Sequence, residues 1–139
     1  MTVTSTPVFS QAINNGVQTI ANGDGTTAKT LVTAGANGTR VYALLVTSTD
    51  TSNRDLVVNF NTASTNYQIA TVQIPLSSGT ANNVVTVDVL RAANFPGLAY
   101  DAWGNRYIDL AANNLITIAA GSTVTSGKTI TAFAYGSNL

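Results

Sequence analysis

The sequence contains no cysteine and no histidine, and all six of its acidic residues are aspartates. Without cysteine the chain has no disulfide framework, no thiolate metal site and no cysteine nucleophile. Without histidine and glutamate it lacks the usual general base near neutral pH and the commonest metal ligand. These absences lead us to expect a protein that is not an enzyme and that binds no cofactor and no metal.

Charged side chains are also scarce. They make up 9% of the 139 residues, and six basic residues balance six acidic ones, whereas roughly 25% of a typical soluble domain is charged. Nucleic acids and anionic membrane surfaces attract clusters of lysine and arginine, which this chain is too poor in charge to form. We therefore expect neither as a partner. A surface with few ions can pack against another protein without removing water from charges, which suits a subunit of an assembly.

Long hydrophobic runs are absent too. No window approaches the roughly 18 consecutive apolar residues of a membrane-spanning helix, and the N-terminal stretch MTVTSTPVFSQAINNG has neither the charged nor the apolar region of a secretory signal. We expect no membrane span and no secretion signal.

Signals for β-strands dominate the sequence from residue 17 onward. Segments such as TRVYALLVTST (39–49) and YQIATVQIPL (67–76) are rich in β-branched and aromatic residues, and polar turn sequences separate them. There is no strand–helix alternation and no internal repeat. The pattern therefore predicts one all-β domain over residues 17–139, a single antiparallel, jelly-roll-like β-sandwich. The expected strands are 17–20, 29–33, 39–49, 55–60, 67–76, 84–90, 107–110, 115–119 and 128–135.

The last expected strand, 128–135, has the alternation of a strand with one face in the core. One face carries Ile130, Ala132 and Ala134, and the other carries Thr129, Thr131, Phe133 and Tyr135.

Residues 1–16 differ from the rest of the chain, because they are uncharged, rich in polar residues and carry only isolated apolar side chains. We interpret them as an extended N-terminal arm. Thr6, Pro7, Val8 and Phe9 would contact a neighbouring chain, with Val8 and Phe9 docking and the backbone adding hydrogen bonds to an exposed strand edge. The alternative is a frayed terminus, which is common in isolated domains.

Two short segments need a separate interpretation. The stretch GSTVTSGKT (121–129) ends like a phosphate-binding loop, but Ser122 stands where that motif needs a glycine, and a strand pattern follows instead of a helix. We interpret it as a turn before the last strand. The segment VLRAANFPG (89–97) predicts a short helical link that Pro96 ends.

The sequence STDTSNRD contains a cluster of two aspartates and one arginine, Asp50, Asp55 and Arg54. It lacks the alternating ligands, the central glycine and the closing glutamate of a calcium-binding EF-hand loop. We therefore expect a solvated turn with a local ion pair, and exposed pairs of this kind contribute about 0–1 kcal/mol.

The segment FPGLAYDAWGNRYIDL (95–110) is the strongest candidate for a binding surface, because it combines aromatic side chains with polar ones, including Trp103, Arg106 and Tyr107. Such a cluster can stack on a sugar or anchor a partner protein. The alternative is structural: Trp103 and Tyr107 cover the edge of the sandwich, while Gly104-Asn105 forms a turn.

Three stretches occur in an order that resembles small structural proteins of tailed bacteriophages. They are TPVFSQ (6–11), GTTAKTLVTAGANGTRVYALLVTSTDTSNRDLVVNF (25–60) and RAANFPGLAYDAWGNRYIDLAANNLITIAAG (91–121). Over most of its length the chain resembles in particular a capsid decoration, or cement, protein. The resemblance implies a virion protein, made in the cytoplasm of the host bacterium, that binds the major capsid protein on the outside of the head. It also implies a trimer at sites where capsomers meet, with residues 6–11 as the arm and residues 101–107 as a loop on the sandwich.

We therefore expect a non-catalytic homotrimer that stabilises a phage shell. The alternative is a receptor- or glycan-binding β-sandwich module of a phage tail fibre or baseplate, with Trp103 and nearby tyrosines as the platform. The partner-binding residues that we expect are Thr6, Pro7, Val8, Phe9, Trp103, Arg106 and Tyr107.

Overall fold

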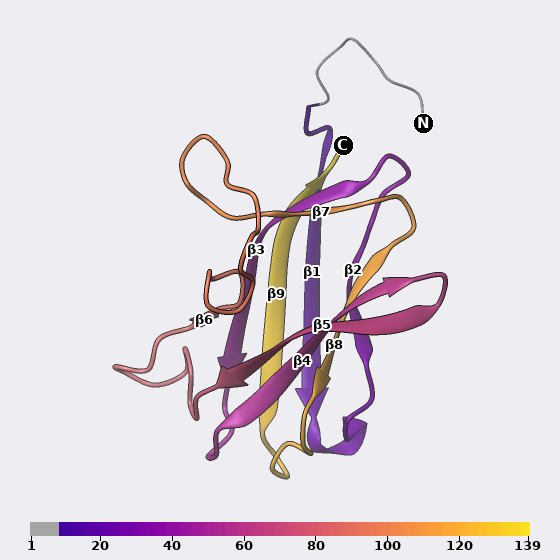
Figure 1. Cartoon of the computed structure of the whole chain (residues 1–139). Helices are drawn as coiled ribbons and strands as arrows, with labels where there is room; N and C mark the ends of the chain where they lie inside the picture. Colours follow the sequence, from indigo (N-terminus) through magenta and orange to yellow (C-terminus); the bar gives the residue numbers. More distant parts are fainter. Residues whose placement is uncertain (1–8) are drawn as a thin grey trace.

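The computed structural model of the chain describes residues 9–139, and these form two antiparallel β-sheets that pack against each other (Figure 1). The all-β sandwich expected from the sequence is thereby confirmed. Sheet A has the order β1-β9-β3-β6, with β7 also paired to β3, and sheet B has the order β2-β8-β4-β5. The strands of sheet A are β1 (Ala12–Ala21), β3 (Thr39–Ser48), β6 (Val87–Asp88), β7 (Ile108–Leu110) and β9 (Thr129–Asn138). Those of sheet B are β2 (Lys29–Thr33), β4 (Arg54–Thr62), β5 (Thr65–Ile74) and β8 (Leu115–Ala120).

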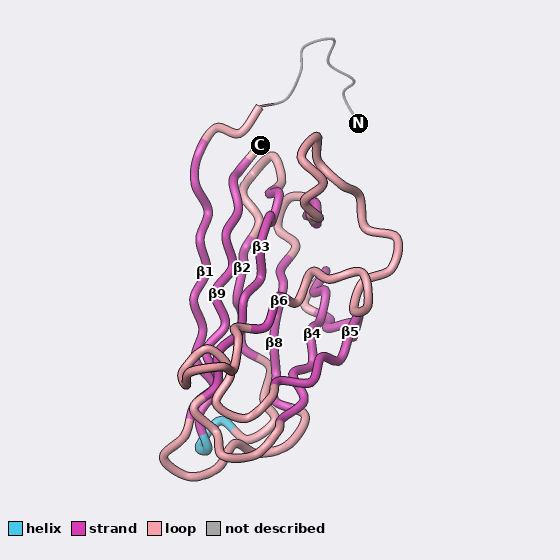
Figure 2. Tube along the Cα trace, turned by 90° about the vertical axis from the view of Figure 1, so that its left-hand side faces the viewer, coloured by secondary structure: helices cyan, strands magenta, loops and turns pink. Residues whose placement is uncertain are grey.

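The strands pair from the two ends of the chain inward. β1 pairs with β9, β2 with β8, β3 with β6 and β7, and β4 with β5. This is the connectivity of one long antiparallel ribbon rolled into two layers, and it is consistent with the jelly-roll-like arrangement expected from the sequence. Figure 2, seen from the side, shows β1 and β9 in one layer and β4 and β5 in the other.

The core lies between the two sheets and is built by strand alternation. In β9, Ile130, Ala132 and Ala134 are fully buried, as predicted. They pack in one cluster with residues of sheet B such as Leu56 and Ile118. Burying a side chain of valine, leucine or isoleucine contributes about 1.5–3 kcal/mol, so this cluster is the main source of stability.

One edge of the sandwich is closed where β1 meets β2. A Cβ atom on Gly16 would lie 1.9 Å from the carbonyl oxygen of Leu31, so only glycine allows the two strands to approach this closely. Polar side chains complete the contact: the amide of Asn14 donates to the Thr33 carbonyl (2.9 Å), and that of Gln18 donates to the Thr30 carbonyl (3.0 Å).

The structure moves the start of the sandwich. Residues 12–16, which the sequence analysis assigned to the arm, form the first half of β1 and pair with β9 from Ala12↔Asn138 onward. Of the arm residues that we singled out, Phe9 is described and is 72% exposed, whereas Thr6, Pro7 and Val8 lie outside the described residues.

Two other expectations differ from the structure. The predicted helical link at 89–97 is a series of turns. The Arg91 carbonyl accepts from the Phe95 amide (2.9 Å), as in one helical turn. The helix does not continue, because Pro96 follows and Gly97 has a φ of +87°. The predicted strand 84–90 shrinks to Val87–Asp88, because Val84 is bridged to Ala81 in a tight turn and the Ser48 amide at the end of β3 donates to the Ser78 carbonyl instead.

Candidate interaction surface

The outer face of sheet A, which points away from the core, exposes large apolar side chains. We define it by Ile13 and Val17 of β1, Phe133 and Tyr135 of β9, and Leu45 of β3. Val17, Phe133 and Leu45 form one row across the three strands. Ile13 is 71% exposed, Val17 62% and Tyr135 44%. Monomeric proteins seldom leave such a contiguous apolar patch in water, and such patches mark interaction sites.

From Ile13 to Gln18 the strand β1 has its polar and apolar faces reversed relative to a normal sandwich strand, whereas Ile20 further along is buried in the core. Ile13 and Val17 point outward, whereas Asn14 and Gln18 point toward the backbone of β2. The polar residues satisfy hydrogen-bonding groups at the closed edge, but among residues 9–139 no contact explains the outward apolar ones. An interface would use them.

Charge on the outer face of sheet A is confined to the beginning of β3 and to the edge strands. β1 and β9 contain no charged residue, β3 contains Arg40 at its beginning, and β6 and β7 add Asp88, opposite Leu45, and Asp109, opposite Arg40. The guanidinium of Arg40 donates to both carboxylate oxygens of Asp109 (2.7 and 2.9 Å) and lies 4.0 Å from the centre of the Tyr107 ring. Hydrogen bonding to Asp109 raises the pKa of Arg40. A partner that covers this face would have to desolvate few ions.

Two hollows of about 360 Å³ each flank Tyr42 on this face. A β-bulge between Val41 and Ala43 inserts Tyr42 as an extra residue in β3, and bulges of this kind redirect side chains. The first hollow, which we call the β1–β9 hollow, is lined by Ser10, Ile13, Tyr42, Tyr135 and Ser137, among others. The rings of Tyr42 and Tyr135 are 6.4 Å apart at a tilt of 44°.

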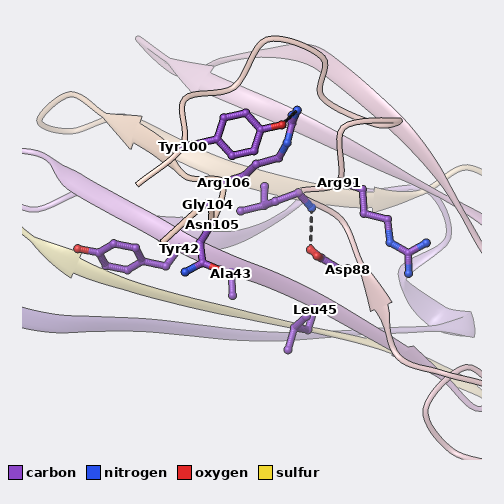
Figure 3. A pocket seen from close by; sticks show the side chains of 10 residues that line it. Tyr42, Ala43, Leu45, Asp88, Arg91, Tyr100, Gly104, Asn105 and Arg106 are labelled. Carbon is purple, nitrogen blue, oxygen red and sulfur yellow. Dashed lines mark hydrogen bonds between the residues drawn. The ribbon is translucent and has the colours of Figure 1, made fainter. Parts of the chain in front are cut away.

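The second hollow, which we call the loop hollow, lies between β3 and the segment that precedes β7 (Figure 3). Leu45 and Tyr42 form its floor on the strand side, and Tyr100, Asn105 and Arg106 close it on the other side.

Residues 100–106 form a compact hairpin-like loop, which we call the Trp103 loop. Asp101 organises it: its carboxylate accepts from the backbone amides of Trp103 (2.9 Å) and Asn105 (2.8 Å), and its own amide donates to the Asn105 carbonyl (2.8 Å). Donation from Asn105 lowers the pKa of the Asp101 carboxyl. Gly104 has a φ of +83° at the turn. The loop is therefore ordered by its own hydrogen bonds, and Trp103 at its tip is 85% exposed.

Arg106 and Tyr107 stand at the base of this loop. Arg106 donates to the Tyr100 hydroxyl (2.7 Å) and to the Phe95 carbonyl, and its guanidinium lies 4.8 Å from the centre of the Tyr100 ring. The Tyr107 ring packs under Arg40. Of the three residues predicted here, Arg106 and Tyr107 thus support the loop, whereas Trp103 does not cover the sandwich edge as the structural alternative supposed.

The acidic cluster at Asp50 differs from the expected solvated turn. Asp50 is fully buried. Its carboxylate accepts from Arg54 Nε (2.9 Å), from the amide and hydroxyl of Thr125 (3.0 and 2.8 Å) and from the Ser52 amide (3.0 Å). Burial alone would raise the pKa of Asp50, but these hydrogen bonds outweigh it and hold the pKa far below its usual range. The cluster ties the β3–β4 turn to the β8–β9 loop, and its role is structural.

The stretch 121–129 is a turn, as predicted. Gly127 has a φ of +75°, the Lys128 amide donates to the Thr125 carbonyl (3.0 Å), and β9 follows at once. Among residues 9–139, no group of three or more acidic, histidine or cysteine side chains is placed to hold a metal ion. In the same part of the chain no helix is long and apolar enough to span a membrane.

Sequence reasoning found only part of the outer face of sheet A. Phe133 and Tyr135 were placed on the face of their strand that points away from Ile130, Ala132 and Ala134. Leu45 lies in a nearly continuous apolar run without alternation, and Ile13 and Val17 were divided between the arm and the sandwich. The signal was present in AINNGVQTIA, where Ile13 and Val17 share one parity and Asn14 and Gln18 the other.

No protein-family model and no curated protein matches the chain. Among solved structures, a chain of the structure titled "Cyanophage Pam1 capsid asymmetric unit" is similar, with a TM-score of 0.45 and 11% identity over 99% of this chain and 94% of that chain. At this identity the similarity assigns no residue of this chain a role.

Proposed function

We propose that this chain is a non-catalytic structural protein of a bacteriophage virion. It binds the outer surface of the capsid as a homotrimer where capsomers meet, contacts the major capsid protein and stabilises the shell. The observation that carries the proposal is the apolar outer face of sheet A, where β1 and β9 carry no charge and Ile13 and Val17 are turned toward solvent. The resemblance of the sequence to decoration proteins of tailed phages supports the same role.

Low charge and repetition both favour attachment of this protein to a shell. A face without ions loses little solvation when it is covered, and threonine and valine side chains lose less rotamer entropy than lysine or arginine would. Each contact with the shell can be weak, because subunits joined within a trimer bind at a high effective concentration. The segment that precedes β1 is uncharged and supplies a second contact through Thr6, Pro7, Val8 and Phe9.

Co-sedimentation tests the proposal. Shells purified from a phage that encodes the chain, but lacking the protein, are mixed with the wild-type protein and with a variant that lacks residues 2–8. This deletion spares β1, which begins at Ala12. We expect the wild type to sediment with the shells and the variant to bind more weakly at an unchanged melting temperature. Absence of the wild type from the pellet would refute the shell-binding role, whereas full binding by the variant would refute only the arm.

One observation favours a second candidate function, the receptor- or glycan-binding module. Trp103 (85% exposed) and Tyr100 (58% exposed) are presented by an ordered loop, as a sugar-stacking platform requires. A glycan array that compares the wild type with Trp103→Ala tests it. A sugar bound only by the wild type, with both proteins folded, would favour this alternative.

A further inference from the structure

The Trp103 loop has the properties of a preformed anchor. A tryptophan side chain can bury about 150–250 Å², but Trp103 is 85% exposed within its own chain. The backbone around it is already fixed by Asp101, whose carboxylate accepts hydrogen bonds from the amides of Trp103 and Asn105. Ordering therefore costs little when a partner covers the side chain, and exposed but preorganised aromatic residues are typical of binding hot spots.

The β1–β9 hollow has the properties of a matching socket. Its volume of about 360 Å³ lies within the roughly 300–1,000 Å³ of small-ligand sites. Ile13 and Tyr135 provide apolar walls, and both side chains are exposed. The buried hydroxyl of Ser137 donates to that of Tyr42 (3.3 Å) and accepts from Ser10. A hydroxyl oxygen has two acceptor lone pairs, so this cluster keeps an acceptor for the donor-only indole N–H.

The anchor and the socket lie toward opposite sides of sheet A. The Trp103 loop leads into β7, which pairs along β3, whereas the hollow is centred on β9 and β1 at the other side of the strand order. Figure 1 shows the loop on the β3 side and β1 on the other. Two different patches placed in this way join copies head to tail, and such heterologous contacts close into a ring when the rotation between copies fits.

The surface beside the socket is large enough for a stable contact. The strands β1, β3 and β9 have ten residues each. At about 3.4 Å per residue and about 4.8 Å between strands, the three cover a flat area of roughly 490 Å², to which protruding side chains add. A tryptophan adds about 150–250 Å², and a standard interface buries about 800 Å² per partner. The socket strands β1 and β9 carry no charge, so the uncharged indole of a second copy can enter without desolvating an ion on the socket side.

We propose that the indole of Trp103 in one copy inserts into the β1–β9 hollow of the next copy, and that this contact builds the ring. The inference rests on the proposed function in that it takes the trimer as the assembled form. It assigns the anchor to Trp103 and the socket to the hollow around Ile13, Tyr42 and Tyr135.

Native mass spectrometry of the full-length chain at a series of concentrations tests the inference. Trp103→Ala should weaken each contact about 30-fold, the change that corresponds to the loss of a hot spot, and should leave a monomer at concentrations where the wild type is a trimer. Tyr67→Ala is the matched control, because Tyr67 is an exposed aromatic residue (55%) on β5 of the other sheet, and it should remain a trimer. Circular dichroism and melting temperature verify that all variants are folded.

Mixing two defective variants tests the pairing itself. Ile13→Asp damages the socket but keeps the anchor, and Trp103→Ala does the reverse. Each alone should be monomeric, and their mixture should yield a dimer of one copy of each, because one intact anchor then meets one intact socket. A trimeric Trp103→Ala variant, or a mixture that stays monomeric, would overturn the inference while leaving the proposed function intact. A monomeric wild type would overturn both.

Discussion

At the scale of single residues, the few charges of this protein are used to hold the fold together. Asp50 is the clearest case, because a fully buried carboxylate is stabilised only by the donors that surround it. Asp101 does the same for the Trp103 loop, and Asp109 pairs with Arg40. Although charged residues are few in the sequence, these three therefore each stabilise a part of the fold.

Asp50→Asn should destabilise the fold by about 3 kcal/mol, near the lower end of the range for a broken buried ion pair, since Arg54 keeps some access to water. Urea unfolding at pH 7 measures this. Asp55→Asn is the control, because Asp55 is exposed on β4, and it should change the stability by less than about 0.5 kcal/mol.

The same residue gives the fold a defined pH dependence. The pKa of Asp50 is lowered in the folded state, so the unfolded state binds more protons in acid. The stabilisation is fully present above the unfolded pKa, about 3.9, and is lost progressively as the pH falls toward the folded value. The free energy of unfolding should therefore decrease from about pH 5 downward. The decrease should be shallower in Asp50→Asn, and equal slopes in the two proteins would contradict this account.

At the scale of strands and turns, the sequence could predict those features that depend on local residue patterns, namely the alternation of apolar and polar residues and the residue types of turns. The strand 29–33 and the inward face of β9 follow directly from such patterns. Two features depend on contacts between distant segments and could not be predicted: the reversed faces of β1 arise from its approach to β2 at Gly16, and Asp50 is buried by the loop that carries Thr125.

The turn between β4 and β5 contains a local conflict between sequence and conformation. Ala63 and Ser64 adopt φ angles of +50° and +63°, a region that costs most residues other than glycine about 1–2 kcal/mol. Ser64→Gly removes this cost but adds about 0.4–1 kcal/mol of conformational entropy to the unfolded chain. It should therefore raise the free energy of unfolding by about 0.5–1 kcal/mol. Ser126→Gly is the control, since Ser126 is an exposed turn residue without a positive φ, and it should give no gain. Thermal unfolding of both variants provides the comparison.

At the scale of the whole molecule, the outer face of sheet A should determine association. Val17→Lys places a charge in its central row and should prevent trimer formation without loss of folding, whereas Ile69→Lys on β5, also exposed, should not. Light scattering distinguishes the two.

The dissociation constant of the wild-type trimer should change little between low and high sodium chloride, because few ions are screened. The trimer should weaken on cooling, as apolar contacts do. A trimer that dissociates in salt would contradict an apolar interface.

The pairing of the first strand with the last places the Gln11 amide against the Asn138 carbonyl, 2.9 Å away. The beginning of β1 and the end of β9 therefore lie at one pole of the molecule (Figure 1). A gene in which a short connector joins the original ends, and which starts instead within the exposed Ala63–Ser64 turn, should still encode the same sandwich. Cargo attached at those new ends would be displayed from the tip of the β4–β5 hairpin.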